Sequence, residues 1–194
     1  DPTCESKQVP CSFVYRGHGL NFMTDAGVFS KGELDTGTRL LLDALPDVYG
    51  DVLDLGCGWG AIGVAVKKKD PAAHVTMVDV NRRALELCRF NAVRNGITAE
   101  CLESDGMAEV MERTFDFIIT NPPIRASKPV IYRMFADAAS RLNPGGALYL
   151  VIRKQQGAEN AVCQGGQGGQ IRRILGAPGK RAAEERKRSA GGSS

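Results

Sequence analysis

The sequence predicts an α/β protein with a doubly wound, mostly parallel sheet and a small N-terminal β-hairpin. Short apolar runs alternate with helix-like patterns between residues 51 and 152, which is typical of strands and helices that alternate along a parallel sheet. The first apolar run is followed by Gly56, Gly58 and Gly60, as in the strand–turn–helix unit of Rossmann-like sheets. Residues 157–194 show neither pattern.

The composition is that of one soluble globular domain, with 194 residues of which 43% are apolar and 24% charged. Six cysteines without a C-x-x-C pair favour reduced thiols and offer no zinc-ligand spacing, so no metal is expected. No apolar run approaches the roughly 20 residues of a membrane span, and the first residues do not resemble a signal peptide. We therefore expect a cytoplasmic protein without membrane contact, and a chain that begins inside a longer one.

The N-terminal part predicts a hairpin, a loop and a helix. Residues 11–24 predict two short strands around a Gly-His-Gly turn at His18, because apolar residues recur with period two. A loop with two glycines follows at 25–32. A helix should begin at Thr36 or Thr38 and end before Pro46.

The central part predicts the sheet and its covering helices. Residues 51–55 form the first apolar run, and residues 61–69 after the glycine turn predict a helix with lysines at its C-terminal end. Further strands are expected at 73–79, 99–103, 115–120 and 147–152, and further helices at 81–95 and 130–142.

The tail, residues 157–194, is rich in Gly, Gln, Ala and Arg. We expect it to be mostly disordered, because it holds too little apolar surface to offset the entropy of ordering. Its last 24 residues carry seven basic and two acidic side chains, a local charge of +5, whereas the rest of the chain carries −2. Such a tail is either a solvated charge run or a contact to RNA.

Polar residues end four successive predicted strands, and the carboxyl ends of parallel strands meet at one edge of the sheet. These residues are Asp54 with Gly56, Gly58 and Gly60, then Asp79, Asp105 and Asn121. The glycine spacing alone also permits NAD, since residues 56–61 fit G-x-G-x-x-G/A and an acidic residue follows 23 positions after Gly56. The spacing therefore locates a site without choosing its ligand.

The combination of motifs resembles class I S-adenosylmethionine-dependent methyltransferases, and within them the "methyltransferase small domain" group, which includes bacterial ribosomal RNA guanine-N2 methyltransferases. Residues 54–60 are similar to motif I, residues 27–42 to the segment that precedes it, and Asn121-Pro122-Pro123 to the N-P-P motif of amino-group methyltransferases. The resemblance implies a catalytic turn formed by Asn121, Pro122 and Pro123. It implies a cofactor site formed by Phe29, Ser30, Asp54, Gly56, Cys57, Gly58, Gly60, Asp79, Val80, Asp105, Gly106 and Asn121.

The chemistry of the Asn-Pro-Pro turn agrees with this resemblance. An exocyclic amine is a weak nucleophile, and the Asn121 side-chain oxygen with the Pro122 carbonyl can accept its two N–H bonds and orient it. Proline fixes φ and has no N–H to compete for the acceptor. Ile124 stands where many such enzymes have an aromatic residue, so stacking on a base would be weaker there, or would be supplied by Phe29 or Tyr132 instead.

The resemblance implies three parts: residues 1–35 as a hairpin with a cofactor-covering loop, 36–156 as the methyltransferase core, and 157–194 as the tail that replaces the terminal strands of the group. The expected function is transfer of a methyl group from S-adenosylmethionine to guanine N2 in ribosomal RNA, with RNA as partner and no prediction of oligomeric state. Adenine N6 or a protein glutamine are alternative acceptors. A non-catalytic cofactor-binding module also remains open, as does the role of Trp59, which either borders the cofactor or packs on the hairpin.

Overall fold

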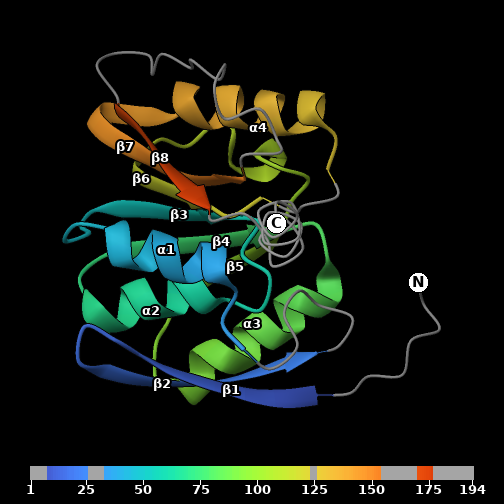
Figure 1. The fold of residues 1–194 in the computed structure, drawn as a ribbon. Helices are drawn as coiled ribbons and strands as arrows, with labels where there is room; N and C mark the ends of the chain where they lie inside the picture. The colour runs from blue at the N-terminus through green and yellow to red at the C-terminus, as the bar shows by residue number, and fades with distance from the viewer. Residues whose placement is uncertain (1–7, 26–32, 123–125, 154–169, 177–194) are drawn as a thin grey trace, which may run out of the picture.

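The computed structural model describes residues 8–25, 33–122, 126–153 and 170–176. A central sheet separates one helix, α4, from three helices, α1 to α3, and the N-terminal hairpin forms an outer layer beneath α2 and α3 (Figure 1). The helices are α1 (Thr36–Ala44), α2 (Ala61–Lys69), α3 (Arg82–Arg94) and α4 (Lys128–Ser140), with a short 3-10 turn, η1 (Ala108–Val110). None of the helices in these described ranges is long and apolar enough to span a bilayer.

The sheet is parallel throughout its described strands, in the order β5-β4-β3-β6-β7-β8. From β3 the chain first adds β4 and β5 on one side and then returns to add β6, β7 and β8 on the other side, so the direction of strand addition reverses beside β3. This is the topological switch point at which α/β sheets bind ligands. The strands are β3 (Asp51–Leu55), β4 (His74–Asp79), β5 (Glu100–Glu103), β6 (Phe115–Thr120), β7 (Leu142–Arg153) and β8 (Gln170–Gly176).

Alternating side chains divide the sheet into two apolar cores. On β3, Val52 packs with α1, α2, α3 and the hairpin, whereas Leu53 and Leu55 pack with η1 and α4. On β6, Ile119 belongs to the first core and Ile118 to the second. Strands buried on both faces are expected to be continuously apolar, which is why these segments are recognisable in the sequence.

The hairpin consists of β1 (Gln8–Tyr15) and β2 (His18–Asp25), joined by a two-residue turn at Arg16 and Gly17 with φ values of 44° and 81°. Positive φ at both central residues is typical of the tight turns that match the twist of paired strands. The predicted hairpin is confirmed, but its turn lies one residue earlier than the expected Gly-His-Gly centre, and His18 is already paired with Tyr15 in the ladder.

Asn91 of α3 and Asn95 at the C-cap of α3 attach β2 of the hairpin to this helix. Asn91 Oδ1 accepts from the Met23 N–H at 2.8 Å and its Nδ2 donates to the Met23 carbonyl at 2.9 Å. Asn95 forms the equivalent pair with the backbone of Asn21 at 3.0 and 2.8 Å. Trp59 packs edge-on against Phe22 with ring centroids 4.9 Å apart. Of the two roles left open for Trp59, the structure therefore shows contact with the hairpin.

The predicted α/β class and the predicted helices and sheet strands up to β7 are confirmed, with two differences. β7 begins at Leu142 rather than near residue 147, because Leu142 pairs with Phe115 before a shift in register. Residues 170–176, expected to lie in a tail without strands, form β8 parallel to β7. Without β8, β7 would be an edge strand with unpaired backbone N–H and C=O groups. A segment of modest apolar content can pair with such groups through its own backbone.

Candidate cofactor and acceptor site

The residues predicted at the strand ends do lie along one edge of the sheet. β3 pairs with β4 and β6, and β4 pairs with β5, all in parallel, so their carboxyl ends point the same way. Backbone bonds fix the segments after the strands to one another: the Gly56 and Cys57 N–H groups both donate to the Val78 carbonyl at 2.9 Å, and the Ser104 N–H donates to the Asp79 carbonyl at 3.0 Å.

The glycine turn offers open space rather than free donors. Gly56 and Gly58 have φ values of 73° and 55°, and a Cβ added to either would meet no atom within 4 Å. The N–H groups of Gly56 and Cys57 are used as described, that of Gly58 donates to Asp79, and that of Gly60 donates to the Cys57 carbonyl at 3.0 Å. A ligand can therefore approach the turn closely, but it finds few unbonded backbone N–H groups there.

Asp79 connects the glycine turn to the start of α3. Its Oδ2 accepts from the Gly58 N–H at 2.8 Å, and its Oδ1 accepts from the Asn81 N–H at 2.9 Å. A carboxylate has about four acceptor positions, so both oxygens keep capacity for two ligand hydroxyls. Val80, the next residue, is 65% exposed, and its apolar side chain is available to pack against a flat ring.

Asp54 lies beneath the turn and not in the open crevice. Its side chain is only 1% exposed and accepts a hydrogen bond from the Gly63 N–H at 2.8 Å. Burial raises the pKa of this carboxyl to about 7, with the bond from Gly63 opposing and the nearby Asp79 charge adding to the increase. A direct ligand contact, as expected from the sequence, does not fit this burial. Asp54 instead supports the turn from below.

Gly60 and Gly63 allow α2 to begin close to the neighbouring elements. A Cβ on Gly60 would lie 2.8 Å from Cys88 Sγ, and one on Gly63 would lie 2.4 Å from Met77 Sδ. Gly60 also has a φ of 94° at the N-cap of α2. These two glycines are thus required by packing, whereas Gly56 and Gly58 border open space.

The turn after β5 presents Asp105. Ser104 is buried and stabilises the turn: its hydroxyl donates to the Gly106 carbonyl at 2.9 Å and accepts from the Glu109 N–H at 3.1 Å. Gly106 adopts a φ of 57°. Asp105 itself is exposed, so its carboxylate is available to a polar group of a ligand.

Asn121 is held by residues from a distant part of the chain. Its Nδ2 donates to Asp35 Oδ2 at 2.8 Å and to Thr38 Oγ1 at 3.1 Å. Asp35 is also the N-cap of α1, where the same oxygen accepts from the Gly37 and Thr38 N–H groups at 2.9 and 3.2 Å. Within the described chain no hydrogen bond reaches Asn121 Oδ1. The amide oxygen therefore remains as an acceptor beside Pro122.

The base of the Asn-Pro-Pro turn is fixed to β3. Thr120 is fully buried and its hydroxyl donates to the Leu55 carbonyl at 2.8 Å, while Pro122 is buried. Three predicted site residues, Pro123, Phe29 and Ser30, lie outside the described residues. The turn thus begins directly beside the strand that leads into the glycine turn.

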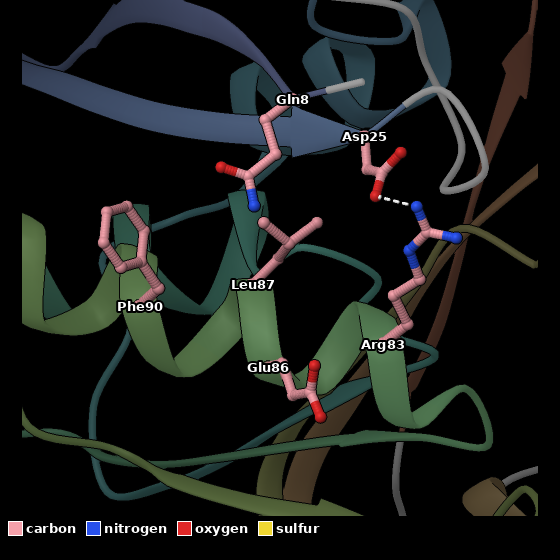
Figure 2. A pocket seen from close by; sticks show the side chains of 6 residues that line it. All are labelled: Gln8, Asp25, Arg83, Glu86, Leu87 and Phe90. Atoms are coloured by element: carbon pink, nitrogen blue, oxygen red, sulfur yellow. Dashed lines mark ion pairs between the residues drawn. The ribbon is translucent and has the colours of Figure 1, made fainter. Parts of the chain in front are cut away.

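An ion pair joins the end of β2 to the first turn of α3. Asp25, only 2% exposed, lies 2.5 Å from Arg83, and both line a shallow hollow with Gln8, Leu87 and Phe90 (Figure 2). Asp25 is the last described residue before 26–32, and Arg83 follows Asp79 by four positions. The end of the hairpin is therefore attached to α3, at a residue four positions after Asp79.

Two residues of this site, Asp35 and Thr38, were given no role by the sequence. The sequence has an Asp-x-Gly-Thr pattern at 35–38, but helix capping explains an Asp before a helix equally well. Among the described residues, no group of three or more His, Cys, Asp or Glu side chains is arranged to hold a metal ion.

Comparison with known proteins identifies the family. The model of the methyltransferase small domain family matches residues 19–171. Protein YbxB of Bacillus subtilis is 43% identical over 165 residues, which cover 83% of this chain and 82% of YbxB. Ribosomal RNA small subunit methyltransferase C of Hahella chejuensis is 42% identical over 140 residues, covering 70% of this chain and 41% of that protein.

A solved structure shows the same fold with ligands bound. The 16S rRNA N2 G1207 methyltransferase (RsmC) of T. thermophilus, in complex with AdoMet and guanosine, is 32% identical with a TM-score of 0.66, covering 75% of this chain and 41% of that one. The chain thus spans about two fifths of the ribosomal RNA methyltransferases that it matches. With the family model covering most of its length, the chain belongs to the methyltransferase small domain family.

Proposed function

We propose that this chain is an S-adenosylmethionine-dependent N-methyltransferase whose acceptor is the exocyclic amine, N2, of a guanine in ribosomal RNA. The observation that carries the proposal is the state of Asn121: its amide nitrogen is bonded to Asp35 and Thr38, and its oxygen has no hydrogen bond from the described chain. The named relatives that methylate small-subunit ribosomal RNA support this choice of acceptor. Because the proposed substrate is ribosomal RNA, we also predict that the protein is located in the cytoplasm.

The site suits a cationic, hydroxyl-bearing cofactor better than a dinucleotide. Asp79 keeps acceptor capacity for ribose hydroxyls, Val80 can pack on adenine, and Asp105 can accept from its amino group. A pyrophosphate needs free N–H donors, yet four N–H groups of the glycine turn are bonded within the protein. The two carboxyls that face the site, Asp79 and Asp105, also disfavour a doubly negative group. NAD is therefore the weaker alternative.

The cofactor supplies an electrophilic methyl group on a sulfonium sulfur. The protein's contribution is to hold the amine in line with it: Asn121 Oδ1 and the Pro122 carbonyl accept the two N–H bonds and favour the positive charge that develops on nitrogen. A base in a structured RNA has to be unstacked to reach such a turn. No strong base would be needed for the transfer, because the nitrogen would become positively charged on gaining the methyl group and could then release its proton to water.

Acceptor assays with methyl-labelled cofactor test the proposal. Label should enter undermethylated small-subunit ribosomal RNA and be recovered as N2-methylguanine. Recovery in adenine of free DNA, or in a release-factor glutamine, would select one of the alternative acceptors instead. Binding of cofactor with no transfer to any of these would favour the non-catalytic module, and tighter binding of NAD than of S-adenosylmethionine would contradict the cofactor assignment.

A further inference from the structure

We infer that Asp35 and Thr38 are positioning residues that fix the orientation of the Asn121 side chain. The expected effect on kcat rests on the proposed function, whereas the hydrogen bonds to Asn121 do not depend on it. Both residues bind the same atom, Asn121 Nδ2, at 2.8 and 3.1 Å. An amide nitrogen has two N–H bonds, so the two acceptors use its full donor capacity.

The chemistry of the two acceptors determines which end of the amide faces them. An ionised carboxylate accepts hydrogen bonds and cannot donate them, so Asp35 can pair only with the nitrogen end of Asn121. If the amide rotated by 180°, its oxygen would face the Asp35 oxygen at the same short distance and the two would repel. Asp35 therefore selects one of the two amide orientations, the one in which Oδ1 is presented as an acceptor.

The start of α1 is pressed against Asn121, which makes the arrangement rigid. A Cβ added to Gly37 would lie 2.9 Å from Asp35 Oδ2, 3.0 Å from Val151 Cγ1 and 3.1 Å from Asn121 Nδ2. Asp35 cannot move away without losing its bonds to the Gly37 and Thr38 N–H groups. The helix cap and the orientation of Asn121 are thus provided by the same carboxylate oxygen.

This arrangement gives the Asp-x-Gly-Thr segment a function besides helix capping. Capping alone requires a short polar side chain at position 35 and nothing of residue 38 beyond its helical backbone. Orientation of Asn121 additionally requires an acceptor long enough to reach Asn121 and a hydroxyl at position 38. The two roles can therefore be separated by substitution.

Three variants of the full chain separate them. Thr38→Val removes one acceptor without changing the cap, and Thr38→Ser restores the hydroxyl. Asp35→Ser keeps an N-cap residue but is too short to reach Asn121. Thr76→Val is the matched control, because the Thr76 hydroxyl also makes a hydrogen bond to another side chain, donating to Glu100 at 3.2 Å, but lies outside the site.

We expect Thr38→Val to lower kcat for guanine methylation about 10-fold and Asp35→Ser about 100-fold, since misplacement of a reacting group has effects of this size. The dissociation constant of S-adenosylmethionine should stay within about twofold, and Thr38→Ser and Thr76→Val should keep kcat near wild type. Unchanged kcat in both Thr38→Val and Asp35→Ser, or an equal loss in Thr38→Ser, would overturn the inference.

A measurement without turnover distinguishes failure of this inference from failure of the proposed function. The side-chain NH2 signals of Asn121, assigned in ¹⁵N-correlated NMR spectra by their loss in Asn121→Ala, should shift in Thr38→Val and Asp35→Ser and stay in place in Thr76→Val. Unshifted signals would refute the positioning role whatever the acceptor is. If the Asn121 signals shift in the two variants but the wild-type protein methylates no guanine, the proposed function is refuted and the positioning role stands.

Discussion

The two halves of the site are constructed in different ways. The cofactor half, at the ends of β3 and β4, is joined by hydrogen bonds between residues close in sequence: Gly63 to Asp54 across 9 positions and Gly58 to Asp79 across 21. The acceptor half, at the end of β6, depends on bonds from Asn121 to Asp35 and Thr38 across 86 and 83 positions. The first half is thus a local motif, whereas the second exists only after α1 has packed against the end of β6.

This difference predicts that the two halves fail separately. A change in the acceptor half should reduce transfer and spare cofactor binding, since within the described residues the side-chain hydrogen bonds of Asn121 run to Asp35 and Thr38 and not to the glycine turn. A change in the cofactor half should weaken binding or stability first, because the turn, Asp79 and Asp54 support one another.

The largest effect is expected for Asn121→Ala. Loss of the acceptor oxygen should lower the rate of methyl transfer about 1,000-fold, with the dissociation constant of S-adenosylmethionine changed by less than about threefold. Single-turnover transfer and equilibrium titration measure the two quantities. Asn143→Ala is the control, because the Asn143 amide also binds an aspartate, Asp116, at 3.0 Å but at the opposite edge of the sheet. Transfer that survived in Asn121→Ala would show that the acceptor is held elsewhere.

Asp54 predicts a pH dependence of stability. Its pKa in the folded protein, about 7, lies above the ordinary value of 3.8, so between these pH values the folded state binds more protons than the unfolded state. The contribution of Asp54 is therefore fully present below about pH 4 and is lost as the pH rises to 7, by up to roughly 4 kcal/mol. Asp54→Asn keeps an acceptor for Gly63 and should flatten this slope. Denaturant unfolding at several pH values tests it, and an identical slope in the variant would contradict the assignment.

Asp79→Ala should weaken cofactor binding about 100-fold, which corresponds to roughly 2.7 kcal/mol. It removes the ligand acceptor and also frees the Gly58 and Asn81 N–H groups that Asp79 now binds. Calorimetric titration with S-adenosylmethionine measures the loss. Asp51→Ala at the opposite end of β3 is the control and should bind normally. If Asp79→Ala bound the cofactor as tightly as Asp51→Ala, the ribose contact would have to be assigned to another residue.

The smallest effect concerns packing beneath the turn. Gly63→Ala places a Cβ 2.4 Å from Met77 Sδ, so we expect a loss of about 2 kcal/mol in the free energy of unfolding. Gly19→Ala adds a methyl group where nothing lies within 4 Å, and its stability should change by less than about 0.5 kcal/mol. Equal stability of the two variants would mean that Met77 moves aside freely.

The strands and helices up to β7 were predictable because their signals are local. Strands buried on both faces are continuously apolar, and Asp35 and Asn81 cap the helices that follow them. β8 could not be predicted, because its pairing depends on the open edge of β7 and not on a pattern of its own. The displaced hairpin turn has a similar origin, since pairing along the whole strands sets the register.

The sequence alone determined the strand ends at which the site lies and the residue types that occupy them, because parallel strands bring successive carboxyl ends to one edge. It also identified the family, through Asp54–Gly60 and the Asn-Pro-Pro turn. Only the tertiary structure showed that Asp54 is buried beneath the turn, that the N–H groups of the turn are already bonded, and that Asp35 and Thr38 hold Asn121. Burial and hydrogen-bond partners depend on which distant segments meet, and the spacing of residues within a motif does not contain that information.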